Sequence, residues 1–191
     1  MPGQRVVVTR HGETEWSRDG RHTGRSDVPL TEHGEQEARA LRSVFARERF
    51  GAVFSSPLRR ALETCRLAGF VEGVVVDPDL REWNYGDYEG MTSAEIRQER
   101  PGWVLWRDGC PGGESIEQVA HRADRMIDRF RAVDGDVLAF GHGHLLRILT
   151  ARWLDMQAVA GQRFALEPAS PSTLGYERDW TALLGWNEAQ R

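Results

Sequence analysis

Two short apolar runs, one near the N-terminus and one in the second half of the chain, dominate the pattern of hydrophobic and polar positions. Residues 5–9 (RVVVT) and 136–141 (DVLAFG) have the length and the β-favouring or apolar content of buried strands. A histidine and a glycine follow each run, as His11-Gly12 and His142-Gly143. In open α/β sheets, ligands bind beyond the carboxyl ends of the strands. The pattern therefore predicts that two strand-end histidines meet in one crevice.

The rest of the chain alternates between apolar runs and helical periodicity, which favours an α/β architecture over an all-helical or all-strand one. Further strands are expected at residues 52–55, 74–76, 173–176 and 182–186. Helices are expected at residues 31–47 with Thr31 as N-cap, from Pro57 to near Gly69, and at 145–153. In the second of these helices, Leu58, Leu62 and Cys65 are expected to face the core.

Two segments fit capping boxes, T-S-A-E at residues 92–95 and S-I-E-Q at 115–118. In such a box, the side chains of the first and fourth residues each accept a backbone N–H of the other. Helices are therefore predicted to begin after Thr92 and after Ser115, the second running to Phe130.

Length and composition indicate one domain over residues 1–191. The net charge of −4 argues against a nucleic-acid-binding surface, although all 25 basic residues are arginine. No apolar run reaches the length of a membrane span, and the N-terminus lacks the sections of a signal peptide. A cytoplasmic location without a membrane partner is expected. Cys65 and Cys110 do not make a disulfide framework.

Arg10 and His11 are the first candidates for chemistry. The Arg10 guanidinium has a fork geometry that suits phosphate oxygens. A neutral histidine ring can attack phosphorus, provided that its other nitrogen is held as a donor, for which a backbone carbonyl in residues 12–14 is a candidate. A lone Arg-His pair more often marks a structural histidine, but the second strand-His-Gly pattern favours the phosphate interpretation.

Five motifs follow one another along the chain: R-H-G-E-T at residues 10–14, T-G-R-S-D at 23–27, S-S-P-L-R-R-A-L-E-T at 55–64, L-R-E at 80–82 with Y-G-D-Y-E-G at 85–90, and G-H-G at 141–143. In their order and spacing they resemble the histidine phosphatase superfamily, the phosphoglycerate-mutase-like proteins. Residues 82–90, 106–115 and 141–144 further resemble the bacterial acid phosphatases and the fungal sugar-bisphosphatase of that superfamily.

The resemblance implies a three-layer α/β/α sandwich around a mixed, mostly parallel sheet. It also implies that His11 is the nucleophile, that Glu82 is the acid and later the base, and that Arg10, Arg60 and His142 surround the transferring phosphoryl group. Arg59 and Arg60 are not separated by periodicity. The family pattern selects Arg60 and leaves Arg59 on the surface.

Other site residues are expected with alternatives. Thr23 and Gly24 are expected to donate a hydroxyl and N–H groups to phosphate, or else to form an ordinary turn. Ser17 stands where the mutases carry asparagine and still offers one hydroxyl donor. Four further residues are expected to contact the substrate or to belong to loop and core: His22, His144, Trp83 and Trp106. Asp87 and Glu89 are alternative acids, or loop carboxylates that cap backbone groups.

The function implied is that of a phosphomonoesterase of the acid phosphatase type, acting on small phosphorylated metabolites through a phosphohistidine. The alternatives are a cofactor-dependent phosphoglycerate mutase, a sugar-bisphosphate phosphatase, and a non-catalytic phosphoryl-binding module. Mutases carry Glu-Arg at the acid motif, whereas Trp83 follows Glu82 here, which favours the phosphatase.

We expect an acidic pH optimum and neither cofactor nor metal, since arginines and histidines supply the positive charge without a carboxylate cluster. A homodimer through the C-terminal part of the chain is one expectation for the oligomeric state.

Overall fold

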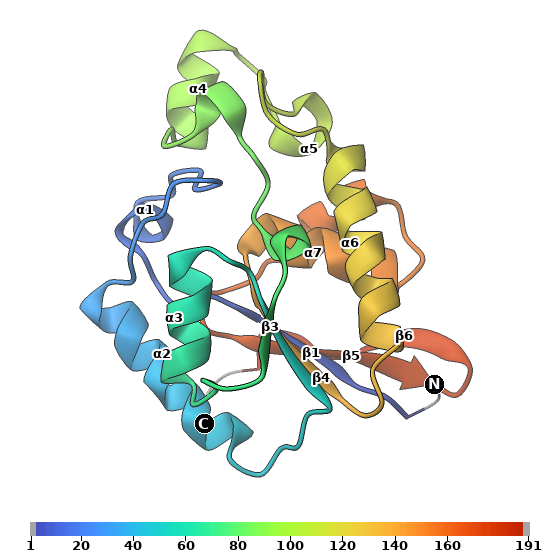
Figure 1. Cartoon of the computed structure of the whole chain (residues 1–191). Helices are drawn as coiled ribbons and strands as arrows, with labels where there is room; N and C mark the ends of the chain where they lie inside the picture. The colour runs from blue at the N-terminus through green and yellow to red at the C-terminus, as the bar shows by residue number, and fades with distance from the viewer. Residues whose placement is uncertain (1–2, 189–191) are drawn as a thin grey trace.

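Within residues 3–188, which the computed structural model describes, six strands form one mixed sheet in the order β3-β2-β4-β1-β5-β6 (Figure 1). The strands are β1 (Val6–Arg10), β2 (Ala52–Ser55), β3 (Val74–Val76), β4 (Val137–Gly141), β5 (Pro171–Glu177) and β6 (Trp180–Gly185). Strands β3, β2, β4 and β1 are parallel neighbours, while β5 and β6 are antiparallel additions. The predicted mixed, mostly parallel sheet is confirmed.

Helices cover both faces of the sheet, which gives the predicted three-layer arrangement (Figure 1). Helices α2 (Glu32–Phe45) and α3 (Arg59–Leu67) lie on one face, and α6 (Ile116–Arg131) and α7 (Gly143–Trp153) lie on the other. Successive side chains of a strand point to opposite faces. Val7 therefore packs with α2 and α3, whereas Val6 and Val8 pack with α6 and α7.

The helix starts predicted from capping residues are confirmed. The Thr31 side chain accepts the Gly34 N–H at the start of α2. Both capping boxes are formed, at Thr92 for α4 (Ser93–Glu99) and at Ser115 for α6. Helix α6 ends at Arg131, one residue beyond the predicted end.

The prediction for α3 is wrong in its start and for two of the three residues expected to face the core, whereas Cys65 is buried as predicted. The helix begins at Arg59 after an N-cap at Leu58, so Pro57 lies outside it. Leu58 and Leu62 are partly exposed, and the buried residues are Arg60, Ala61, Thr64, Cys65 and Leu67. The helix buries polar residues because they form hydrogen bonds at the end of the sheet: the Thr64 hydroxyl accepts the Gly12 N–H at 3.0 Å.

Five short elements had no periodicity from which to predict them: α1 (Glu15–Arg18), η1 (Pro78–Leu80), η2 (Gly86–Tyr88), α5 (Leu105–Asp108) and η3 (Ala158–Arg163). Helices α1, α4 and α5 lie beyond one end of the sheet (Figure 1). No helix among residues 3–188 is long and apolar enough to cross a bilayer.

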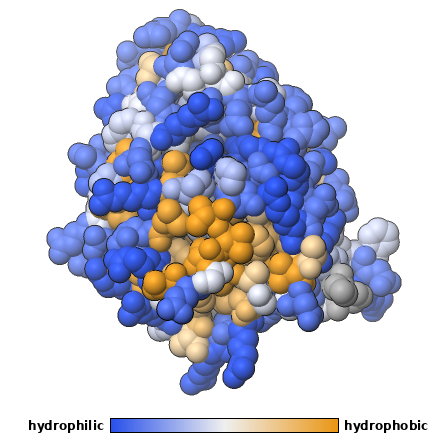
Figure 2. Space-filling model, viewed as in Figure 1, coloured by the Kyte–Doolittle hydropathy of each residue, from blue (hydrophilic) through white to orange (hydrophobic). Residues whose placement is uncertain are grey.

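Both edges of the sheet expose apolar side chains. Val75 and Val76 on β3 are about half exposed, as is Leu184 on β6, and Trp180 on β6 is 78% exposed. Figure 2 shows an apolar patch on the face where β3 and α3 lie. With Val71, which is 70% exposed, this patch forms an apolar surface beside β3.

Candidate active site

The two strand-end histidines lie side by side, as predicted. In the parallel pair of β1 and β4, Arg10 is opposite Gly141, so both chains leave the sheet at the same place. The His11 N–H donates to the Gly141 carbonyl at 3.0 Å. The ring centroids of His11 and His142 are consequently 5.2 Å apart.

His11 is held in one tautomer by its own turn. Its Nδ1 lies 2.7 Å from the Gly12 carbonyl oxygen, which can only accept, so Nδ1 carries the proton and Nε2 keeps its lone pair. Burial, with the nearby Arg60 and Arg10 guanidinium groups, holds the pKa of His11 well below its usual value. Gly12 is required because a Cβ there would meet the Gly34 carbonyl at 2.4 Å.

His142 is fully buried, and one of its ring nitrogens has no partner. Its Nε2 lies 2.8 Å from the Ser56 hydroxyl, whereas Nδ1 has no hydrogen-bond partner among the described residues. Burial is the main cause that lowers the pKa of His142, and electrostatic interactions with Arg60 and His11 lower it further. Ser56 was not singled out from the sequence. The feature that could have identified Ser56 is its position directly after β2, the strand next to β4 in the sheet.

Arg10 and Arg60 each have a buried Nε atom without a hydrogen-bond partner among the described residues. Arg10 donates through Nη1 to the Leu166 carbonyl at 2.7 Å. Arg60 is fully buried and donates to three carbonyls of one loop, those of Thr23, Gly24 and Ser26. Burial lowers the pKa of both, but a guanidinium remains charged at neutral pH. Arg59 is exposed, as the family pattern predicted.

Three backbone N–H groups fix the carboxyl group of Glu82. Oε1 accepts from Trp83 and Leu145, each at 2.9 Å, and Oε2 accepts from His144 at 3.0 Å. Two of these donors belong to the first turn of α7, where orphan N–H groups attract carboxylates. Oε2 therefore retains a position for a further hydrogen bond or a proton.

Of these groups, Arg10, His11 and Glu82 line a cavity of about 170 Å³, whereas Arg60 and His142 lie buried behind its wall. Its wall contains Arg10, His11, Ser17, Gly20, Arg21, His22, Thr23, Glu82, Tyr85, Gly143, His144, Arg147 and Leu166. A larger groove, of about 640 Å³, lies between α2 and β5, and no histidine lines it. The smaller cavity is the candidate active site because the strand-end histidine and the carboxyl group both open into it.

Of the expected phosphate-binding residues in the first loops, two line the cavity and one does not. Ser17 lines it, but its hydroxyl already accepts the Thr14 N–H in a capping box and donates to the Thr14 carbonyl. The Thr23 hydroxyl donates to the Arg21 carbonyl at 3.1 Å. Gly24 lies outside the cavity, and its N–H donates to Glu89 at 2.9 Å. Glu89 thus caps backbone groups, the alternative noted from the sequence.

His22 and His144 line the cavity as neutral rings. Burial lowers the pKa of His22 to about 4, and burial together with Arg147 lowers that of His144. Nδ1 of His144 lies 2.7 Å from the Tyr85 hydroxyl. Both histidines can exchange hydrogen bonds with a neutral polar group of a ligand.

The two tryptophans expected to contact substrate do not line the cavity. Trp83 is fully buried because its indole N–H donates to the Glu114 carbonyl at 2.8 Å. Trp106 stacks beneath the Arg147 guanidinium, 4.7 Å from its ring centroid. Both positions agree with the alternative noted from the sequence, in which these tryptophans support the structure around the site.

Arg21 and Arg147 line the cavity but were not predicted. Arg147 follows His144 by three positions on α7, so both lie on one face of that helix. That spacing is the signal that could have revealed Arg147. The cavity therefore holds two cations besides Arg10.

The chemistry of the site is that of arginine and histidine. Among the described residues, no group of three or more His, Cys, Asp or Glu side chains is placed to hold a metal ion. In this arrangement, neutral His11 can act as a nucleophile, the arginines can stabilise negative charge, and Glu82 can transfer a proton.

Comparisons with known proteins agree with this geometry. The model of the histidine phosphatase superfamily (branch 1) matches residues 6–189. An acid phosphatase of Mycobacterium tuberculosis is 40% identical over 91% of this chain and 87% of its own. A sedoheptulose 1,7-bisphosphatase of Saccharomyces cerevisiae is 40% identical over 80% of this chain and 68% of its own. The solved structure of a Mycobacterium tuberculosis open reading frame has a TM-score of 0.93 at 37% identity, covering 99% of this chain and 100% of that chain.

Proposed function

Because the chain belongs to branch 1 of the histidine phosphatase superfamily and is a phosphatase, we propose that it hydrolyses monoesters of small phosphorylated metabolites through a phosphohistidine at His11. The observation that carries the proposal is a set of three buried side-chain nitrogens near His11 that lack partners among the described residues: Arg10 Nε, Arg60 Nε and His142 Nδ1. Buried polar groups are nearly always satisfied, so three together call for an explanation. The oxygens of a phosphoryl group would satisfy all three.

The proposed reaction has two steps. In the first, the Nε2 lone pair of His11 forms a bond to phosphorus while the bond to the leaving oxygen breaks, and Glu82 gives its proton to that oxygen. In the second, Glu82 takes a proton from water as the water oxygen attacks phosphorus. The nitrogen–phosphorus bond breaks and its electron pair returns to Nε2. Arg10, Arg60 and His142 stabilise the charge on the phosphoryl oxygens in both steps.

An acidic pH optimum also stays a proposal, and the pKa of His11 supports it. His11 attacks only when Nε2 is unprotonated. Because burial and two arginines lower the pKa of His11 well below its usual value, the ring stays neutral in mildly acidic solution. The substrate phosphate, with its second pKa of about 6, titrates in the same range.

A sugar bisphosphate is the second candidate substrate, because Arg21 and Arg147 add two cations to the cavity. One relative is named a sedoheptulose 1,7-bisphosphatase. The mutase alternative also stays open. The Trp83 side chain is buried outside the cavity. The residue at position 83 therefore does not decide whether a substrate carboxylate finds a cation in the cavity.

Phosphate release over a panel of sugar monophosphates, sugar bisphosphates, phosphoglycerates and an aryl phosphate tests the proposal. A parallel assay follows interconversion of 2- and 3-phosphoglycerate with and without bisphosphoglycerate. We expect phosphate release to exceed interconversion by a wide margin. Interconversion that needs bisphosphoglycerate and outruns phosphate release on every monoester would make the protein a mutase. Failure to release phosphate from any ester would favour a phosphoryl-binding module.

A single domain, a cytoplasmic location and a homodimer complete the proposal. The exposed valines beside β3 and the exposed Trp180 and Leu184 of β6 support self-association at a sheet edge. Sedimentation velocity distinguishes monomer from dimer. Val76→Lys tests an interface at the β3 edge, and Leu184→Lys tests one at the β6 edge, in the C-terminal part of the chain expected from the sequence. The substitution that turns the dimer into a monomer identifies the edge.

A further inference from the structure

The segment that carries Glu82 lies between two 3-10 helices, η1 and η2, and has no strand or α-helix of its own. Its position therefore depends on contacts from elsewhere. A carboxyl group that must protonate one particular oxygen works only when it is held within a fraction of an ångström of the productive geometry. The contacts that hold the backbone of residues 79–84 thus bear directly on catalysis.

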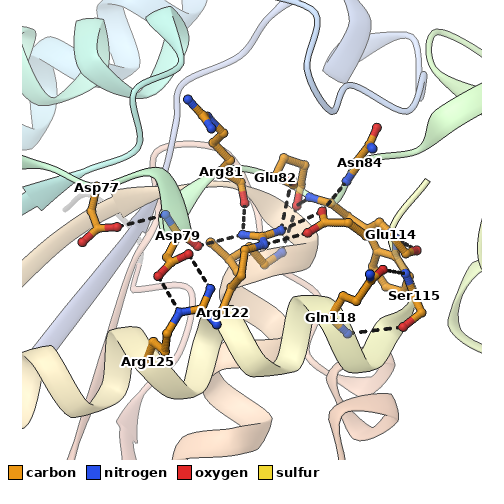
Figure 3. A network of polar contacts seen from close by, with 12 residues as sticks. Asp77, Asp79, Arg81, Glu82, Asn84, Glu114, Ser115, Gln118, Arg122 and Arg125 are labelled. Atoms are coloured by element: carbon orange, nitrogen blue, oxygen red, sulfur yellow. Dashed lines mark hydrogen bonds and ion pairs between the residues drawn. The ribbon is translucent and has the colours of Figure 1, made fainter. Parts of the chain in front are cut away.

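The Arg122 side chain on α6 forms hydrogen bonds with backbone carbonyls of this segment (Figure 3). Nη1 donates to the carbonyls of Asp79 at 2.7 Å and Arg81 at 2.9 Å, and Nη2 donates to the carbonyl of Glu82 at 3.4 Å. The guanidinium has five N–H donors, and these bonds use three of them.

The other two donors bind Glu114. Nε of Arg122 reaches Oε1 at 2.8 Å and Nη2 reaches Oε2 at 2.9 Å, a two-pronged ion pair whose side chains are 12% and 22% exposed. Such a fork fixes orientation as well as distance. All five donors of Arg122 are therefore matched to five acceptors.

Glu114 holds the far side of the same segment. Its Oε2 accepts the Asn84 N–H at 2.9 Å, its N–H donates to the Asn84 carbonyl at 2.9 Å, and its carbonyl accepts the Trp83 indole N–H at 2.8 Å. Arg122 and Glu114 together fix the chain on both sides of Glu82 (Figure 3). The carboxyl group is then directed to the first turn of α7, where it receives the His144 and Leu145 N–H groups.

We propose that Arg122, through its pairing with Glu114, is a positioning residue for the proton-transfer group Glu82. The inference rests on the proposed function of Glu82 as acid and base. Neither Arg122 nor Glu114 lines the cavity, so they act through the backbone of residues 79–84.

Arg122→Lys is the main test variant, because lysine keeps the charge but cannot reproduce the fork. Arg125→Lys is the matched control. Arg125 lies one turn further along α6 and pairs with the Asp79 side chain at 2.9 and 2.7 Å, but it makes none of the bonds to carbonyls 79–82. Glu114→Gln is a second variant, which removes the ion pair while keeping the size of the side chain.

The readout is the ratio of kcat/KM for an alkyl phosphate to kcat/KM for an aryl phosphate. An alkoxide leaves only with a proton, whereas an aryl oxide is stable enough to leave with little help, so a displaced acid lowers the ratio. The folded fraction of the enzyme cancels in the ratio, so partial unfolding of a variant does not affect it.

We expect Arg122→Lys and Glu114→Gln to lower this ratio by about 10- to 100-fold, and Arg125→Lys to leave it at the wild-type value. An unchanged ratio in Arg122→Lys, when Glu82→Gln lowers it, would overturn the positioning inference alone. An unchanged ratio in Glu82→Gln would overturn the role of Glu82 and the inference with it. An equal fall in Arg125→Lys would reduce Arg122 to a general structural contact.

Discussion

Gly143 shows how the site depends on a single missing side chain. A Cβ at this position would lie 3.5 Å from Arg10 Nε and 3.7 Å from Glu82 Oε2. These are ordinary contact distances, so alanine fits without moving the backbone. The methyl group would nevertheless occupy the space between the cation and the acid, where the phosphoryl group and its leaving oxygen are proposed to bind.

Gly143→Ala is therefore expected to lower kcat/KM by roughly tenfold or more through displacement of the substrate, while the melting temperature stays at or above that of the wild type. Steady-state kinetics and differential scanning calorimetry check the two parts. Wild-type kcat/KM in this variant would show that the reacting groups do not meet beside Gly143.

Sequence reasoning found the residues whose place follows from the strand ends or from the family motifs. His11 and His142 were found in this way, and so was Arg60. It missed Arg147 because that residue lies on a largely apolar helix and reaches the cavity only once α7 has docked. It left Trp83 open between substrate contact and core, and the indole is drawn into the core by a carbonyl 31 positions away.

The N-terminus of α6 is the element on which the support of Glu82 depends. The Ser115 hydroxyl accepts the Gln118 N–H, and Oε1 of Gln118 accepts the Ser115 N–H. Glu114, which pairs with Arg122, directly precedes this cap.

Ser115→Ala is expected to lower the free energy of unfolding by about 1 kcal/mol, which corresponds to a fall of roughly 2–4 °C in melting temperature for a chain of this size. Ser115→Asn, which keeps a capping side chain, should remain within a few tenths of a kcal/mol of the wild type. Equal melting temperatures for alanine and asparagine would contradict a stabilising cap.

At this scale, the starts of α2, α4 and α6 were predictable because each has a capping side chain within four consecutive residues. The buried face of α3 was not. The sequence offered an apolar stripe at Leu58 and Leu62, but the fold buries Arg60 and Thr64 because both bond to the loops at the sheet end. Such long-range polar contacts leave no periodic pattern.

Four neutral histidines make the stability of the whole molecule depend on pH. The pKa values of His11, His22, His142 and His144 are all lowered in the folded protein. Below the unfolded value of about 6.5, the unfolded chain binds more protons than the folded one, so stability falls as the pH falls. For His22, whose pKa is about 4, this loss extends from about pH 6.5 down to pH 4.

His22→Gln should therefore reduce the slope of unfolding free energy against pH by about one proton, or ~1.4 kcal/mol per pH unit, between pH 4.5 and 6. Urea unfolding across this range measures the slope. His33→Gln is the control, since the side chain of His33 is 65% exposed on α2. Identical slopes for His22→Gln and the wild type would contradict a buried neutral His22.

Exhaustive chelation is expected to leave phosphatase activity intact, because Arg10 and Arg60 supply the positive charge around the phosphoryl group. Phosphate release is measured before and after chelator treatment, and again after Mg²⁺ or Zn²⁺ is added back. Activity that is lost on chelation and regained with metal would argue for a different mechanism.

The central claim, a phosphohistidine at His11, is tested most directly by trapping it in Glu82→Gln with a labelled aryl phosphate. An aryl oxide leaves without a proton, so the first step proceeds, while hydrolysis slows for want of a base. We predict a labelled protein that survives a base quench and loses its label in acid, with the label on the His11 peptide and absent from His11→Ala/Glu82→Gln. A label on any other residue, or none at a substrate concentration that saturates the enzyme, would contradict the account.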